Sequence, residues 1–308
     1  MGKLTVSFEW LSSCSGCEVS LVDLHERLLT VLDEIEIVRL PILIDQKDYP
    51  KAVLGIVSGA LRTEHDVECA HRMRKSCDKI LSFGVCAVYG GPQGSCYAHA
   101  QSDVEDTVFR KGPTTSTHFV PDQGLPPVLE DGIRPLDSEI EVDHYLPGCP
   151  PNPYFIAAAL KRIVSGADDE FGPHNVCYRC NRQMKHTDCS KLRREHEGEL
   201  DPSLCFLSQG VVCLGSASLD RCLAPCPKRG VPCSGCGGPS ELVALEPHRD
   251  IRTEVANRMS AMTKIPRESV LAEIEGQAKT HYAYAMASPV FRQKPTFLLR
   301  RWSSKEEG

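Results

Sequence analysis

The chain has 308 residues, of which 41% are hydrophobic and 25% charged, and its formal net charge is −6. This composition is typical of folded globular proteins, and the length predicts about two domains. The negative charge argues against nucleic acid or an anionic membrane as the main partner. No apolar run approaches the ~20 residues of a membrane span. Glu9 stands where a secretion signal would continue its apolar core, so we expect a cytoplasmic protein without direct membrane insertion.

The first half of the sequence alternates strand and helix patterns. Strands are predicted over residues 4–10, 35–40, 52–57, 79–83 and 141–146. Helices are predicted over residues 19–32, 65–77 and 152–164. Strands that alternate with helices indicate a parallel sheet covered on its faces. We therefore expect residues 1–168 to form an α/β domain, a doubly wound parallel sheet of the flavodoxin-like kind.

The remaining sequence has little strand periodicity. Residues 84–139 contain six prolines, and irregular segments of this length often form binding surfaces. We expect residues 169–308 to form an irregular metal-binding domain that ends in a helical tail. The apolar spacing within residues 251–262 and 270–274 predicts helices in that tail.

Cysteine is the unusual residue in this composition. The chain has 16 cysteines; nine lie within residues 177–236, and none follows residue 236. Disulfides are rare in a reducing cytosol. Thiols in such numbers therefore indicate metal binding or redox chemistry.

Four cysteines follow predicted strands of the first domain: Cys14, Cys17, Cys86 and Cys149. In an open α/β sheet, ligands gather outside the carboxyl ends of the strands, so these distant cysteines are expected to converge. Four thiolates suit either a tetrahedral zinc ion or an iron–sulfur cluster of the 4Fe-4S type.

Eight further cysteines provide two more sets of four. The compact spacing of the last four predicts one site from Cys222, Cys226, Cys233 and Cys236. The second site would then use Cys177, Cys180, Cys205 and Cys213, with His174 as an alternative ligand. Thiolates bind both zinc and iron–sulfur clusters, so spacing leaves both open. We expect the four remaining cysteines to be buried thiols: Cys69, Cys77, Cys96 and Cys189.

Three motifs together resemble the small, electron-transferring subunit of nickel–iron hydrogenases. They are Cys-x-x-Cys at 14–17, Gly-x-Cys-Ala at 84–87 with Gly-Gly at 90–91, and Pro-Gly-Cys-Pro-Pro at 147–151. The resemblance covers roughly residues 3–240. It implies that the first set binds a proximal 4Fe-4S cluster, the last four cysteines a medial cluster, and the set that begins at Cys177 a distal cluster.

The resemblance also implies a function and partners. Electrons from H2 oxidation at a nickel–iron site on a large subunit would pass through three 4Fe-4S clusters to an acceptor subunit, either a flavin or an iron–sulfur protein. Cys177 replaces a histidine of the membrane-bound uptake branch, and Cys226 supplies a fourth medial thiolate. These departures favour the cytosolic branch, and within it the methyl-viologen-reducing type linked to heterodisulfide reductase.

One departure concerns a carboxylate. Ser58 stands where many relatives have glutamate before a glycine, and the role of Glu18, beside Cys17, is left open.

Three alternative functions also stay open at this point. They are a zinc-stabilised interaction protein, the small subunit of an NAD(P)- or deazaflavin-linked hydrogenase, and the cluster-bearing subunit of a quinone-reducing complex.

Overall fold

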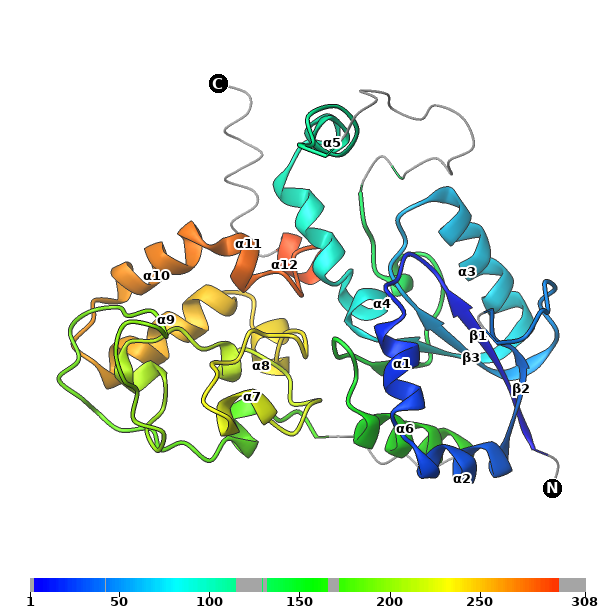
Figure 1. Ribbon diagram of the computed structural model, residues 1–308, viewed down its shortest axis with the longest axis horizontal. Coiled ribbons are helices and arrows are strands. Elements are labelled where there is room, and N and C mark those ends of the chain that lie inside the picture. The colour runs from blue at the N-terminus through cyan, green and yellow to red at the C-terminus, as the bar shows by residue number, and fades with distance from the viewer. Residues whose placement is uncertain (1–2, 42, 115–128, 130–131, 166–171, 294–308) are drawn as a thin grey trace.

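The computed structural model describes residues 3–41, 43–114, 129, 132–165 and 172–293. A five-stranded sheet forms one side of the molecule, with strand order β2-β1-β3-β4-β5 and parallel pairing throughout (Figure 1). The strands are β1 (Leu4–Trp10), β2 (Ile35–Arg39), β3 (Ala52–Ser58), β4 (Cys77–Phe83) and β5 (His144–Leu146). This is the flavodoxin-like order, so the expected α/β fold is confirmed.

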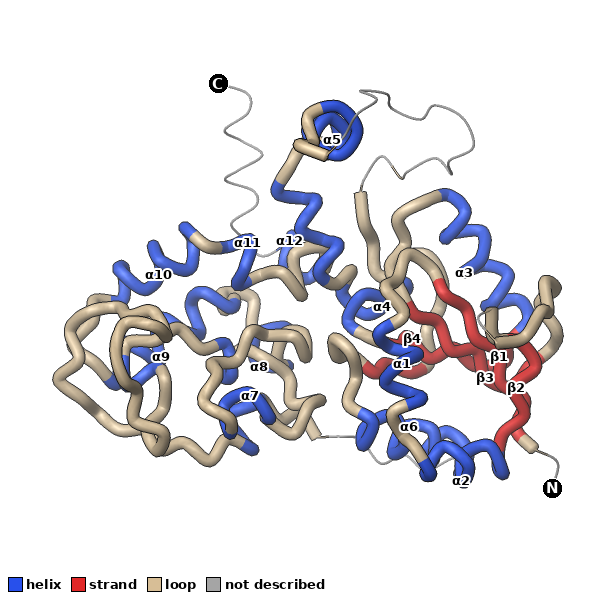
Figure 2. The backbone as a smooth tube through the Cα atoms, viewed as in Figure 1, coloured by secondary structure: helices blue, strands red, loops and turns tan. Residues whose placement is uncertain are grey.

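Helices cover both faces of the sheet (Figure 2). Phe8 and Ile56 face α1 (Gly16–Val22), α2 (Glu26–Glu34) and α6 (Pro153–Ser165). Val57 and Ile80 pack on the opposite side, against α3 (Glu64–Ser76). Because successive strand residues point to opposite faces, near-continuous apolar strands can fill both cores.

The predicted helix over residues 19–32 is wrong as a single element. The chain breaks between α1 and α2 at His25, whose φ is 52°. The turn places Leu24, only 4% exposed, in the core beneath α1. Core packing at the turn therefore overrides a helical pattern that continues through it.

The segment 84–139 also differs from the expected irregular loop. It contains α4 (Val85–Tyr89), α5 (Gln101–Glu105) and short 3-10 and π turns, whereas residues 115–128 and 130–131 lie outside the described part. The described portion packs against the end of the chain, because a Cβ on Gly90 would lie 2.4 Å from the Ala287 Cβ.

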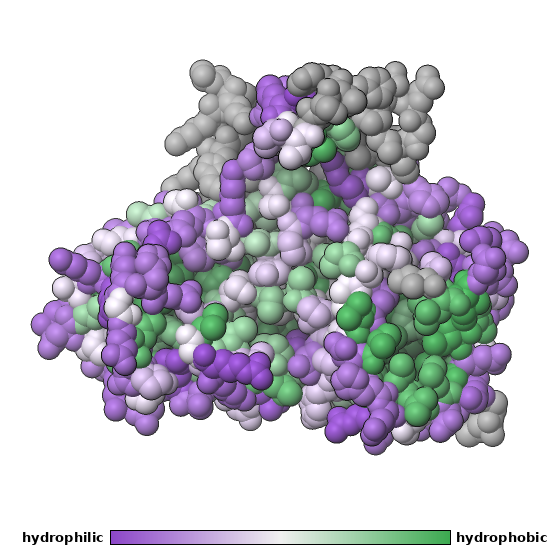
Figure 3. Space-filling view, in the orientation of Figure 1, coloured by the Kyte–Doolittle hydropathy of each residue, from purple (hydrophilic) through white to green (hydrophobic). Residues whose placement is uncertain are grey.

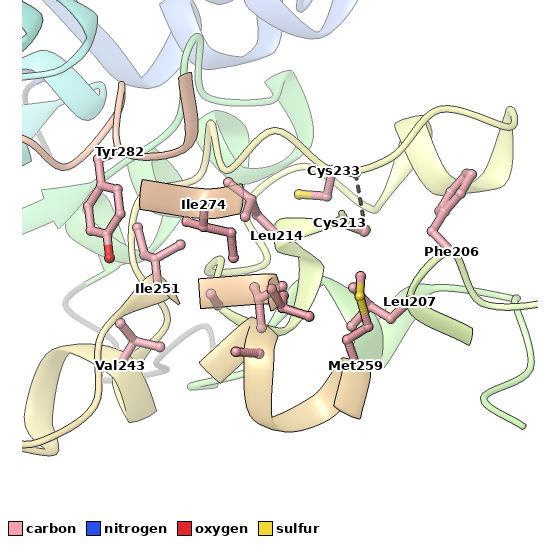
Figure 4. Close-up of a cluster of buried hydrophobic side chains, with 14 of the residues drawn as sticks. Phe206, Leu207, Cys213, Leu214, Cys233, Val243, Ile251, Met259, Ile274 and Tyr282 are labelled. Carbon is pink, nitrogen blue, oxygen red and sulfur yellow. Dashed lines mark hydrogen bonds between the residues drawn. The ribbon is translucent and has the colours of Figure 1, made fainter. Parts of the chain in front are cut away.

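The remainder of the molecule forms a second lobe of loops and short helices (Figure 1). Its helices are α7 (Pro225–Lys228), α8 (Glu241–Leu245), α9 (Ile251–Met262), α10 (Arg267–Gly276), α11 (Ala278–His281) and α12 (Pro289–Gln293). The two predicted tail helices are therefore present as α9 and α10. Their buried faces join one apolar core with the cysteine-bearing loops (Figure 4). The expected domain boundary at residues 168–169 falls outside the described residues.

Candidate metal centres

The carboxyl edge of the sheet brings together the first four cysteines. Cys14 and Cys17 follow β1, Cys86 lies in α4 directly after β4, and Cys149 follows β5. Burial raises the pKa of Cys17 far above its ordinary value, and the charges of Glu18, Cys86, Cys149 and Cys14 raise it further. Burial likewise raises the pKa of Cys86 to about 12, with Cys149 and Cys14 adding to the effect. The four thiols therefore lie near one another, with Cys17 buried, Cys86 and Cys149 partly buried and Cys14 exposed.

Backbone hydrogen bonds hold the loops of this site together. The Gly84 amide donates to the Leu146 carbonyl at 2.8 Å, and the Val85 amide donates to the Gly148 carbonyl at 2.8 Å. Residues that follow β4 and β5 are thus fixed to each other at the strand ends.

Two glycines leave space that a side chain would fill. Gly84 has a φ of +88°, and a Cβ there would lie 2.4 Å from the Cys17 Sγ. Gly91 has a φ of +59°, and its Cβ would lie 2.4 Å from the Cys86 Sγ. Only glycine combines these backbone angles with so close an approach to sulfur.

Glu18 places a buried carboxylate at the first set. Its Oε1 accepts a hydrogen bond from the Ser58 hydroxyl, while its Oε2 is buried without a hydrogen-bond partner among the described residues. The Ser58 hydroxyl therefore holds the Glu18 carboxylate in place beside Cys17. The sequence pattern could not show this contact, because the two residues are 40 positions apart.

The second set gathers around two short 3-10 turns. Cys177 and Cys180 lie in and after Val176–Arg179, and Cys205 and Cys213 flank Leu207–Gln209. Burial raises the pKa of Cys177 to about 12; Cys213, Cys205 and Cys180 add to the effect, and Arg258 opposes it. Gly215 lies against this set, because its Cβ would be 3.3 Å from the Cys177 Sγ.

The third set lies between the other two. Burial raises the pKa of Cys236 to about 12, and Cys222, Cys226 and then Cys149 of the first set add to it. The Cys233 amide donates to the Cys213 Sγ of the second set at 3.2 Å (Figure 4). The third set therefore lies near the first at Cys236 and hydrogen-bonds to the second through Cys233.

Tyr284 is a site residue that the sequence did not reveal. Burial raises the pKa of its phenol, the charges of Cys149 and Cys236 add to the effect, and the Ser234 side chain opposes it. The C-terminal segment thus places a tyrosine where the first and third sets meet. No motif marks it, so only the folded chain identifies it.

The remaining candidate ligands lie apart from these contacts. Cys69 and Cys77 are buried as expected, whereas Cys96 and Cys189 are only partly buried. The His174 ring stacks on Tyr178 with centroids 3.8 Å apart. Among the described residues, no three His, Cys, Asp or Glu side chains lie close enough to hold one metal ion. A cubane accepts its thiolates at four separate irons and therefore needs a wider spacing than one ion does.

Comparisons with known proteins agree with this architecture. The family model described as NADH ubiquinone oxidoreductase, 20 Kd subunit, matches residues 14–163. An F420-non-reducing hydrogenase subunit of Methanocaldococcus jannaschii is 36% identical over 85% of this chain and 90% of its own length. The delta subunit of the NAD-reducing hydrogenase HoxS of Cupriavidus necator is 31% identical over 54% of this chain and 80% of its own.

A solved structure supports the same relationship for the sheet lobe. A chain of an NAD+-reducing [NiFe]-hydrogenase in the H2-reduced state has a TM-score of 0.53 and 28% identity, covering 56% of this chain and 96% of its own. None of the described helices is long and apolar enough to cross a membrane. The chain belongs to the small subunits of nickel–iron hydrogenases, of the F420-non-reducing type, and so is a subunit of an oxidoreductase that acts on H2.

Proposed function

We propose that this chain is the electron-transferring subunit of a cytoplasmic nickel–iron hydrogenase and that it carries three 4Fe-4S clusters. Electrons released by H2 oxidation on the large subunit would leave through it to an acceptor subunit. The observation that supports this proposal is a row of three thiol sets, in which the third set lies near the first and hydrogen-bonds to the second.

The proposed ligands follow the three sets. The proximal ligands are Cys14, Cys17, Cys86 and Cys149, the medial ligands are Cys222, Cys226, Cys233 and Cys236, and the distal ligands are Cys177, Cys180, Cys205 and Cys213. Each set offers four sulfur donors, and at the first set Gly84 and Gly91 leave room where a Cβ would collide with sulfur. When bound, 4Fe-4S clusters supply one-electron transfer at such sites.

The protein contributes the environment of these thiolates. The Cys233 amide donates to the Cys213 Sγ, and such N–H···S bonds stabilise negative charge on sulfur. Burial excludes water from Cys213 and Cys233, which are 8% and 9% exposed. Both features are among those by which proteins set cluster potentials.

Small subunits of this family pair with a large subunit, and an apolar surface beside the first set is suited to that contact. Val19, Val22 and Leu29 on α1 and α2 are 58%, 57% and 66% exposed. Figure 3 shows an apolar area on the lower right of the view, on the side of the molecule that carries α1 and α2. Contiguous exposed apolar surface marks an interaction site. We assign this area to the large subunit, which would hold the nickel–iron site.

The acceptor is proposed to be a flavin or iron–sulfur protein. The M. jannaschii relative is named F420-non-reducing, and it covers most of this chain. The NAD-reducing relative from C. necator matches only 54% of it. The relative that matches more of this chain therefore argues against a deazaflavin as the acceptor, and the shorter match of the NAD-reducing relative gives little support for NAD(P).

Metal analysis of the purified complex tests the proposal. Three cubanes require about twelve iron and twelve acid-labile sulfide atoms per chain, four of each per cluster. Cys17→Ser, Cys180→Ser and Cys226→Ser should each remove about a third of both. Cys189→Ser is the matched control, since the Cys189 thiol donates to the Lys191 carbonyl outside the three sets, and it should retain both in full. Stoichiometric zinc without sulfide would overturn the proposal and favour the zinc-stabilised alternative.

A further inference from the structure

Two cysteine-bearing loops of the second lobe concentrate positive charge. Residues 177–187 and 221–240 contain six arginines and lysines and no acidic residue, although the whole chain has a net charge of −6. The same loops carry six of the eight cysteines of the second and third sets. Positive charge therefore gathers where the thiols of the second lobe lie.

Arg182 joins the two loops into one surface. Its Nε donates to the Pro227 carbonyl at 2.9 Å, and its Nη1 donates to the Leu204 carbonyl at 3.0 Å. A Cβ on Gly230 would lie 3.9 Å from its Nη2. Because these acceptors are neutral carbonyls, the arginine keeps its positive charge while it holds the turn at Lys228 beside its own loop.

Most of the cations on this surface are not neutralised. Arg179 pairs with the buried Asp220 at 2.5 Å. Lys228 donates only to a carbonyl, and among the described residues neither Lys185 nor Arg229 forms an ion pair. One carboxylate lies near Lys185, that of Asp201, which also accepts hydrogen bonds from Ser203.

We call the set Arg182, Lys185, Lys228 and Arg229 the basic face. It carries four positive charges, whereas Asp201 lies near Lys185 and the buried Asp220 is already paired with Arg179, so the face is net positive. Figure 3 shows strongly hydrophilic side chains over α7, where part of this face lies.

Exposed apolar side chains lie among these cations. Tyr178 is 63% exposed, Met184 57% and Val231 48%. Cys226 of the third set is also exposed. Aromatic, methionine and arginine side chains are enriched in protein interfaces, and the charged groups around them steer the partner. A protein that docked here would come directly against the thiol sets.

We propose that the basic face, with Tyr178, Met184 and Val231, is the docking site of an acidic electron-accepting protein. This proposal rests on the proposed electron-transfer function and names the chemistry of the partner. Complementary charge on a cleft or surface speeds association by 10- to 1,000-fold and makes it salt-dependent. The acceptor is therefore expected to present a carboxylate-rich surface.

The test uses the purified complex of this chain with its large subunit, reduced under H2. Stopped-flow absorbance follows its oxidation by two outer-sphere probes of opposite charge, the cobalt(III) EDTA anion and the cobalt(III) tris-phenanthroline cation. The test variant combines Lys185→Glu, Lys228→Glu and Arg229→Glu. Its control combines Lys51→Glu, Lys75→Glu and Lys79→Glu, the same charge change near the amino ends of β3 and β4, away from the three thiol sets.

In the wild type the rate with the anion should fall as salt rises, whereas the rate with the cation should not. The test variant should lower the ratio of anion rate to cation rate at least tenfold, whereas the control should change it less than twofold. A ratio within twofold of wild type in the test variant would overturn the proposal. So would a native complex in which the test variant retains the acceptor subunit as firmly as wild type does.

Failure of this inference can be told from failure of the proposed function. Iron and sulfide are measured on the same samples before mixing. Absent clusters would refute the electron-transfer function itself. If the clusters are intact and the ratio of anion rate to cation rate is the same in the test variant as in wild type, the docking site alone is refuted.

Discussion

Gly84 offers a severe test of how the first thiol set is built. Its φ of 88° and ψ of 159° lie in a region that is essentially restricted to glycine and costs another residue about 1–3 kcal/mol. In Gly84→Ala the new Cβ would also lie 2.4 Å from the Cys17 Sγ. The side-chain and backbone shifts that such overpacking forces cost about 1–3 kcal/mol more. The substitution should therefore destabilise the protein by about 2–6 kcal/mol and displace Cys17.

Two measurements on the purified complex check this expectation. A loss of 2 kcal/mol alone lowers the Tm of a domain of 150–250 residues by about 4–8 °C, and a displaced Cys17 should remove about four irons per chain. The control is Gly276→Ala at the end of α10, where no atom lies within 4 Å of the new Cβ. It should retain all iron and gain about 0.4–1 kcal/mol. Wild-type Tm and iron content in Gly84→Ala would refute the reasoning.

Three further changes probe the framework around the thiol sets. Asp66→Ala removes the carboxylate that accepts hydrogen bonds from the Thr63 amide in the α3 capping box and from the Ser12 hydroxyl beside the first set, so chemical denaturation should show a loss of about 2–4 kcal/mol. Burial opposes ionisation of Asp143, but hydrogen bonds from the Ile80 amide and Arg74 outweigh it and hold its pKa below the ordinary value. Because its pKa is lowered, the Asp143 carboxylate stabilises the folded protein above about pH 4, and this stabilisation is lost as pH falls. Asp143→Asn should therefore have a lower Tm than wild type at pH 7, and the difference should shrink below about pH 4. Gly215→Val adds atoms against the second set and should shift the potential or lower the occupancy of that set in EPR titrations, while the first set stays unchanged.

The sheet could be predicted from the sequence because its physical signal is local. Buried parallel strands are continuous apolar runs, and the runs at residues 4–10 and 52–57 match β1 and β3 closely. The break at His25 could not be predicted, because its reason is the burial of Leu24 in a core whose other members, such as Ile56 and Phe155, are distant in the sequence. Local pattern shows which residues can be helical, whereas tertiary packing decides where a helix ends.

The first thiol set was foreseeable for a topological reason. Parallel strands end at one edge, so residues after β1, β4 and β5 must meet there. The contact from Ser58 to Glu18 depends on side-chain direction across that edge, which the sequence does not encode locally. Tyr284 was missed for the same reason, since it reaches the junction from a tail without strand periodicity.

The order of the thiol sets in space differs from their order in the chain. Along the sequence, the set that begins at Cys177 comes before the set that ends at Cys236. In space the later set is central, because Cys236 feels the charge of Cys149 while the Cys233 amide donates to Cys213. The first and second sets are therefore connected through the last cysteine-bearing segment to be synthesised. A chain that ended before Cys222 could form the sheet edge, yet it would lack every thiol that joins that edge to the second set.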